Sequence, residues 1–233
     1  MISERKFSNS YTSFWNQLLP TADLFLKKLN LTSGRYCLPT DSIILDRNKR
    51  AIINELAFRI FNKRIKKEKF FLEILIRSVI SYIKRLAPYE TNIVSLSEEE
   101  IAEAKEISQG LSIYFNSVEK VEDSAEVIIW PSFKGCGQLD ECKGDIIYNN
   151  QLIEVKAGDR HFKIIDIRQI ITYLALNFNS KQFELNQIAL VNPRTGLYFN
   201  CSVNDLIEST SGKKPVDIFS EIIYFLSAEI GSI

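Results

Sequence analysis

The chain has 233 residues, of which 45% are hydrophobic and 25% are charged, a composition typical of a globular protein with a full core. Its 29 basic and 29 acidic residues cancel, so the total charge does not identify a partner. No run approaches the ~18 apolar residues that span a bilayer. The first ten residues, MISERKFSNS, lack the apolar segment of a secretory signal, so we expect a cytoplasmic protein without a membrane partner.

The four cysteines and the single histidine restrict the chemistry further. Irregular cysteine spacing favours reduced thiols over a disulfide framework. Cys136 and Cys142 could form half of a zinc site, but no second cysteine pair accompanies them. His161 is the only histidine, which argues against Ser-His-Asp and Cys-His catalysis.

Residues 1–90 are expected to form an N-terminal helical, partly basic region. A short helix is predicted around 22–29, and two amphipathic helices are predicted within 42–86, because apolar residues recur there at spacings of three and four. Pro88 is expected to end the second of these. Residues 46–85 carry twelve Lys or Arg against four acids, which suits a phosphate backbone or, equally, a solvated helix face.

Residues 91–233 are expected to form the second domain. Ser97 and Glu100 make a capping box that opens a helix ending near residue 116. Asp166 is expected to be the N-cap of a later helix. The alternation of strands and helices indicates an α/β protein with a mixed sheet flanked by helices. The later elements are predicted at 127–130 (strand), 144–150 and 151–157 (hairpin), 166–178 (helix), 187–191 and 197–203 (strands), and 216–228 (helix).

The stretch GDIIYNNQLIEVKAG places three charges in one predicted hairpin. With the Asn-Asn pair as its turn, Asp145 lies opposite Glu154, and Lys156 follows on the face of Glu154. Like charges in such a pair repel each other. A divalent cation between the acids would remove the repulsion, and Mg²⁺ is typically held by one or two carboxylates with waters and phosphate oxygens. We therefore expect Asp145 and Glu154 to bind a metal ion.

An exposed Glu-x-Lys face is the ordinary alternative for these charges. Against it, Leu152, Ile153 and Val155 make the strand apolar on both faces. A charged group buried in such a strand is unfavourable unless it is paired or used. A functional role for Glu154 and Lys156 is therefore the better hypothesis.

Asp145, eight intervening residues, Glu154-Val155-Lys156 and a following helix with Gln169 together resemble the PD-(D/E)XK nuclease superfamily, which has the restriction-endonuclease-like fold. The resemblance covers about residues 97–205, with Gly at position 144 where the pattern has Pro. It implies an α-β-β-β-α-β core, here with an N-terminal helical extension, and a Mg²⁺-dependent phosphodiesterase.

The resemblance also implies a role for each matching residue. Asp145 and Glu154 correspond to the metal ligands, and the carbonyl of Val155 to a further ligand. Lys156 corresponds to the catalytic lysine. Gln169 corresponds to a helix glutamine that orients the attacking water or contacts the cleaved strand, and Tyr173 lies one turn further on the same face.

Several other polar residues have more than one interpretation. Glu100 could be an additional helix ligand, although the capping box explains it more simply. Asp140 and Glu141 are expected to be loop or rim residues. A phosphate contact and a solvated position are both open for Arg160, His161, Lys163, Arg168 and Arg194.

The function expected from this resemblance is a Mg²⁺-dependent nuclease acting on DNA, with RNA as a second candidate substrate and Mn²⁺ as a substitute metal. Similar small proteins of the superfamily suggest a DNA endonuclease of a restriction or anti-phage defence system. Double-strand cleavage would favour a homodimer, and a partner subunit of a defence complex is the other arrangement. The alternative is a nuclease-fold subunit that binds nucleic acid or assists assembly and is weak or inactive without its partner.

Overall fold

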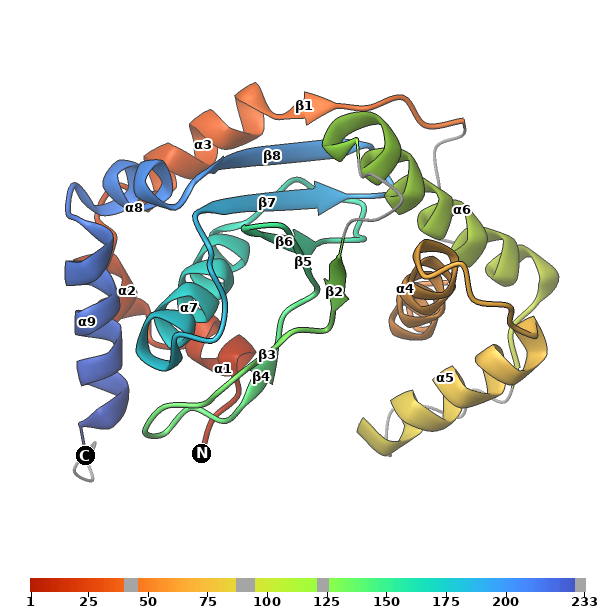
Figure 1. Cartoon of the computed structure of the whole chain (residues 1–233), viewed down its shortest axis with the longest axis horizontal. Helices are drawn as coiled ribbons and strands as arrows, with labels where there is room; N and C mark the ends of the chain where they lie inside the picture. The colour runs from red at the N-terminus through yellow and green to blue at the C-terminus, as the bar shows by residue number, and fades with distance from the viewer. Residues whose placement is uncertain (40–45, 87–94, 121–125, 229–233) are drawn as a thin grey trace.

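The computed structural model describes residues 1–39, 46–86, 95–120 and 126–228. A six-stranded mixed sheet with helices on both faces forms its centre (Figure 1). This α/β architecture confirms the predicted fold class at that level. Pro88, the expected end of a helix, lies outside the described residues.

The sheet has the strand order β1-β8-β7-β6-β5-β2. β6 and β7 are parallel and are joined by helix α7, while every other neighbouring pair in this sheet is antiparallel. A parallel pair needs such a crossover, which places α7 on one face of the sheet. The strands are β1 (Gly34–Arg35), β2 (Val127–Ile129), β5 (Ile146–Tyr148), β6 (Gln151–Val155), β7 (Gln187–Asn192) and β8 (Leu197–Ser202), and α7 spans Ile164–Ser180.

Alternation along the strands produces two cores, one on each face of the sheet. Leu152 belongs to the core under α7, whereas Ile153 belongs to the core under α6 (Glu98–Tyr114) and α4 (Arg50–Ile65). Residues 152, 154 and 156 share a face because strand side chains have a period of two. Glu154 and Lys156 therefore lie on the α7 side of the sheet.

Most of the predicted helices are confirmed. The helix expected at 22–29 is α3 (Ala22–Thr32), the two expected within 42–86 are α4 and α5 (Leu72–Leu86), and the last is α9 (Pro215–Ser227). The capping box opens α6 as predicted, with the Glu100 amide donating to Ser97 Oγ at 3.3 Å and the Ser97 amide donating to Glu100 Oε2 at 2.8 Å. The N-cap expected at Asp166 is wrong: α7 begins after Lys163, and Asp166 accepts from the Lys163 amide at 2.8 Å.

Several short elements were not predicted. Val203 was expected in a strand, but Ser202 caps a helix there, because its Oγ accepts from the Asp205 amide at 3.0 Å. The N-terminal helices are short and are stabilised by tertiary packing, with Phe7 and Trp15 fully buried. These elements are α1 (Glu4–Asn9), α2 (Thr12–Leu18), η1 (Phe115–Glu119), α8 (Val203–Ser211) and a small sheet of β3 (Ser132–Phe133) and β4 (Cys142–Lys143).

Elements of the N-terminal region pack directly on the rest of the chain. β1 pairs with β8, α1 packs on α7, and α4 packs on α6. The predicted boundary between 1–90 and 91–233 falls within 87–94, which is outside the described residues. The proposed two-domain division stays a prediction, while the N-terminal elements are structural neighbours of the sheet.

Helix α6 approaches the turn between β7 and β8 at Gly110. A β-carbon at this position would lie 2.3 Å from the carbonyl oxygen of Pro193. Side-chain atoms do not approach backbone oxygens so closely, and the obstacle is backbone rather than a flexible side chain. Glycine is therefore required by contact with the turn, not by helix geometry.

We expect Gly110→Ala to lower the free energy of unfolding by about 1–3 kcal/mol, because the added methyl group forces α6 away from Pro193. In an open helix the same change would stabilise by roughly 1 kcal/mol. Gln109→Ala, at an exposed position of the same helix, is the control and should be neutral or stabilising. Urea unfolding of the three proteins measures both effects. Equal or higher stability of Gly110→Ala would contradict the close approach.

Candidate active site

The hairpin of β5 and β6 brings the predicted acids to one end of the sheet. Its register is the predicted one, with Tyr148 opposite Gln151 and Ile146 opposite Ile153. Asn149 has a φ of 51°, a value that asparagine tolerates better than most residues. The ladder ends one pair short of Asp145, whose Oδ2 instead accepts a hydrogen bond from the Val155 amide at 2.7 Å.

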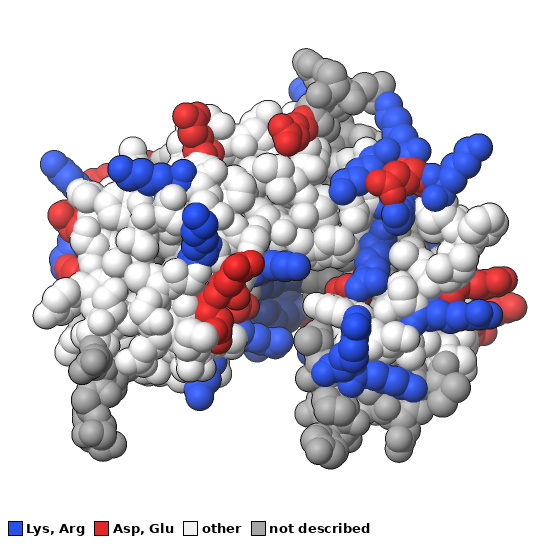
Figure 2. All heavy atoms as spheres, turned by 60° about the horizontal axis from the view of Figure 1, so that its bottom comes forward, with Lys and Arg blue, Asp and Glu red and all other residues white. Residues whose placement is uncertain are grey.

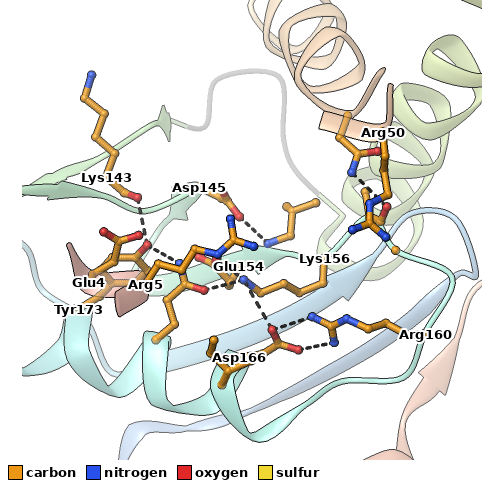
Figure 3. Close-up of a pocket in the computed structure, with 16 residues that line it drawn as sticks. Glu4, Arg5, Arg50, Lys143, Asp145, Glu154, Lys156, Arg160, Asp166 and Tyr173 are labelled. Atoms are coloured by element: carbon orange, nitrogen blue, oxygen red, sulfur yellow. Dashed lines mark hydrogen bonds and ion pairs between the residues drawn. The ribbon is translucent and has the colours of Figure 1, made fainter. Parts of the chain in front are cut away.

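Lys156 is the centre of the cluster. Its Nζ donates to Glu154 Oε1 and to Gln169 Oε1, both at 2.7 Å (Figure 3). Only 16% of the Lys156 side chain is exposed, and Glu154 is 3% exposed. Asp145, Glu154, Lys156 and Gln169, all predicted site residues, are therefore gathered in one place.

Helix α7 holds Lys156 through a chain of hydrogen bonds. Gln169 Nε2 donates to the Tyr173 hydroxyl at 2.8 Å, which in turn donates to the carbonyl of Lys143 at 3.1 Å. The amide oxygen of Gln169 is thereby directed at the ammonium group. Gln169 orients Lys156, a contact that the sequence did not predict.

Asp166 is an acid of the site that the sequence analysis missed. Its two oxygens accept from the Arg160 guanidinium at 2.8 and 3.0 Å, and Oδ1 lies 3.8 Å from Lys156 Nζ. Asp166 precedes Gln169 by three residues and so shares its helix face. The spacing of Asp166 and Gln169 could have predicted that Asp166 faces the site, but Asp166 had been interpreted as an N-cap.

The cluster lies in a cleft with a volume of about 440 Å³. Figure 3 shows the acids and Lys156 at its floor, and Figure 2 shows a hollow between two lobes of the molecule with basic side chains beside it. The N-terminal region also lines the cleft, with Glu4 and Arg5 from α1 and with Arg50 and Asn54 from α4. The site is therefore open and partly built by residues outside the hairpin.

Burial dominates the electrostatics of the two acids. It raises the pKa of Glu154 to about 8, with the neighbouring Asp145 charge adding to the shift and Lys156 opposing it. Burial also raises the pKa of Asp145, against the effects of Lys156 and the Val155 amide. For Lys156, burial acts to lower the pKa, but the charges of Glu154, Asp145 and Asp166 raise it overall. At neutral pH the acid pair therefore holds a proton beside a charged lysine.

The oxygen atoms at the cleft floor fit a hard divalent cation. Glu154 Oε2 is buried and no donor group of the described residues faces it, so it is open to the proton of the acid pair or to a cation that displaces that proton. No set of three or more His, Cys, Asp or Glu able to hold a metal occurs in the described ranges. One or two carboxylates with waters and phosphate oxygens are nevertheless the usual ligands of Mg²⁺, so three acidic groups are not required. Asp145, Glu154 and the Val155 carbonyl are the groups that would hold it.

Other candidate residues are engaged elsewhere. Glu100 pairs with Lys49 at 2.8 Å in addition to its capping role, which accounts for its charge without a metal. Arg168 is buried beside Trp15, with its guanidinium carbon 5.8 Å from the ring centroid, and so faces α2. Neither alternative left open for Arg194, a phosphate contact or a solvated position, fits its side chain, which is 1% exposed and lies 2.5 Å from Glu103.

Arg194 instead supports the segment that follows Lys156. Its Nε donates to the Ala157 carbonyl at 2.9 Å, and Asn54 Nδ2 donates to the same carbonyl at 3.2 Å. Asn192 Nδ2 donates to the carbonyls of Gly158 and Arg160 at 2.8 and 3.2 Å. Residues of α4 and of the β7–β8 turn therefore hold this segment beside the site.

Neither a protein-family model nor a curated protein matches this chain. The function consequently has to be inferred from the geometry and chemistry of the site. None of the helices in the described ranges is long and apolar enough to cross a membrane.

The raised pKa of Glu154 predicts a pH-dependent stability. The folded pKa of about 8 exceeds the ordinary value of 4.5, so the folded state binds more protons between these pH values. The stabilising effect of the proton is complete below about pH 4.5 and is lost as the pH rises through 8. Thermal unfolding in EDTA from pH 5 to pH 9 should show a falling Tm, and the slope should be smaller for Glu154→Gln.

Glu106→Gln, at an exposed position of α6, removes an equal charge and is the control. It should keep the wild-type slope. A slope unchanged in Glu154→Gln, or reduced equally in Glu106→Gln, would contradict a proton held by the buried pair.

Proposed function

We propose that the protein is a Mg²⁺-dependent phosphodiesterase with a restriction-endonuclease-like fold, acting on nucleic acid and first of all on DNA. The observation that carries the proposal is the convergence of Asp145, Glu154 and Lys156 at the floor of an open cleft. A lysine ammonium 2.7 Å from a buried carboxylate, with a second, half-buried carboxylate beside it, combines metal-binding and charge-stabilising groups.

The arrangement of the elements supports the proposed fold. Ignoring the small β3–β4 sheet, the order α6, β2, β5, β6, α7, β7 is helix, three strands, helix and strand. β2, β5 and β6 form an antiparallel meander, and β7 adds parallel to β6. This is the order that the resemblance to the nuclease superfamily implies, and Asp145 and Glu154 lie at the same end of the β5–β6 hairpin.

The proposed reaction is the addition of water across one phosphodiester P–O bond. Asp145 and Glu154 would hold Mg²⁺ with the Val155 carbonyl, and Mn²⁺ could replace it, since both prefer oxygen ligands. The chemistry that the metal supplies is a lower pKa for the attacking water and compensation of charge at the phosphorus. Lys156 remains charged at neutral pH and can stabilise the negative charge that develops on the phosphoryl oxygens.

Gln169 and Asp166 act on Lys156 rather than on the substrate in this proposal. Gln169 Oε1 fixes the direction of the ammonium group. The Arg160 guanidinium compensates the charge of Asp166. Lys156 is therefore left to compensate the charge of Asp145 and Glu154. Within this proposal, a DNA endonuclease in restriction or anti-phage defence is the setting that the resemblance suggests, with a homodimer or partner subunit for double-strand cleavage.

Cleavage of DNA tests the proposal directly. The purified protein with Mg²⁺ or Mn²⁺ should nick supercoiled plasmid or shorten single-stranded DNA, and EDTA should stop it. Lys156→Ala should reduce the rate by about a hundredfold or more, because a charge-stabilising group is lost. Lys134→Ala, at an exposed position away from the cleft, should keep the wild-type rate.

No metal-dependent cleavage of plasmid, duplex, single-stranded DNA or RNA by a folded protein would reject the nuclease proposal for the isolated chain. It would favour the alternative of a binding or assembly subunit. Cleavage that persists in Lys156→Ala would show that the activity has another source.

Metal binding offers a second test that needs no substrate. Calorimetry with Mg²⁺ at pH 7 should show binding that releases about one proton per ion, because the acid pair holds a proton that the cation must displace. The measured enthalpy should then vary with the ionisation enthalpy of the buffer. Asp145→Asn should abolish the binding, whereas Glu106→Gln should not. Binding by Asp145→Asn equal to wild type would exclude this metal site.

A further inference from the structure

Two arginines of the N-terminal region line the active-site cleft without an acidic partner. Of the other cations that line the cleft, Lys156 pairs with Glu154, Arg160 pairs with Asp166, and Lys143 comes from β4, outside the N-terminal region. Arg5 and Arg50 also line the cleft and are exposed, yet neither forms an ion pair with any residue in the described ranges. Their charges are therefore available to a ligand.

The position of Arg5 is fixed although α1 is short. The next residues toward the core, Phe7 and Ser8, are fully buried, and Trp15 Nε1 donates to the Phe7 carbonyl at 2.9 Å. Before the helix, the Ile2 amide donates to the Gln138 carbonyl at 2.8 Å. Both sides of Arg5 are thus anchored to the body of the protein, and its side chain points from the side of Glu4 toward the cluster of Glu154 and Lys156 (Figure 3).

Arg50 is fixed from the opposite side. It begins α4, whose next turn is buried through Ile52 and Ile53. Asn54, one turn after Arg50, bonds the Ala157 carbonyl, which directly follows Lys156 in the chain. The start of α4, and with it Arg50, is therefore held at a fixed position relative to the segment that follows Lys156. Figure 3 shows Arg50 on the other side of the site from Glu4 and Arg5.

The chemistry of the cleft limits what these arginines can bind. Glu4, Asp145, Glu154 and Asp166 are its acids, and they would repel an anion that entered without cations to compensate. A polyanion that crosses the site needs a cation on each side of the acids. Arginine is suited to this role, because its guanidinium stays charged and can bind two phosphate oxygens at once.

We infer that Arg5 and Arg50 contact phosphates of the nucleic-acid backbone on opposite sides of the cleaved bond. The inference rests on the proposed function, and it adds that the N-terminal region supplies substrate contacts to the site. Because phosphate contacts carry no sequence information, these arginines determine affinity and orientation rather than the sequence that is cut.

The salt dependence of binding tests this inference without requiring cleavage. Fluorescence anisotropy with a labelled DNA duplex in EDTA yields Kd over a range of KCl concentrations. The slope of log Kd against log salt should fall by about 0.9 for Arg5→Gln, by about 0.9 for Arg50→Gln and by about twice that for the double variant. Lys6→Gln and Lys28→Gln remove the same charge from exposed positions outside the cleft and outside the basic segment 46–85, and they should keep the wild-type slope.

The outcomes separate this inference from the nuclease proposal. Reduced slopes in the arginine variants support the contacts even if no protein cleaves DNA. Unchanged slopes, equal reductions in the lysine controls, or no binding of the duplex by the wild-type protein would overturn the inference, even if metal-dependent cleavage is observed. Where cleavage occurs, the arginine variants should raise KM more than they lower kcat.

Discussion

The gathering of buried Glu154 with half-buried Asp145 and Lys156 at one end of the β5–β6 hairpin is the constraint on which the site depends. An isolated ion moved into the protein interior loses several kcal/mol of solvation, so none of these groups is stable there alone. Lys156 satisfies this requirement by lying 2.7 Å from Glu154, while the Val155 amide donates to Asp145. Gln169 on α7 is the second hydrogen-bond acceptor of the ammonium group. Helix α7 therefore has to pass beside Lys156.

The segment after Lys156 connects the site to the rest of the fold through hydrogen bonds to its backbone carbonyls. Arg194 and Glu103 are buried together, and breaking such a pair leaves an uncompensated charge. The same Arg194 bonds the Ala157 carbonyl, so α6, the β7–β8 turn and the catalytic segment meet at one guanidinium group. Gly110 permits α6 to approach this turn closely. The helices on the far face of the sheet therefore contribute to the position of Lys156.

How much the sequence predicts follows from how local each signal is. The hairpin register and the capping box depend on neighbouring residues, and both were predicted correctly. Asp166 was misassigned as an N-cap, and a phosphate contact and a solvated position were both open for Arg194. In sequence, an N-cap looks the same as an ion-pair partner, and a loop arginine looks the same as a buried one. The pairing of β1 with β8 joins residues that are far apart in the chain. Because β1 has only two residues, it is too short to show the alternating pattern that predicts a strand.

A buried hairpin motif and a helix glutamine define a site, but they do not define a cleft. Without α1 and α4, Asp145, Glu154 and Lys156 would lie at the end of a sheet with no opposing wall. The N-terminal region lines the cleft from two sides, anchored by Phe7 in α1 and by Asn54 in α4, while α7 lines it as well. The basic segment 46–85 thus has a structural role, because α4 brings Arg50, near its start, to the acids of the cleft, although the chain as a whole is neutral.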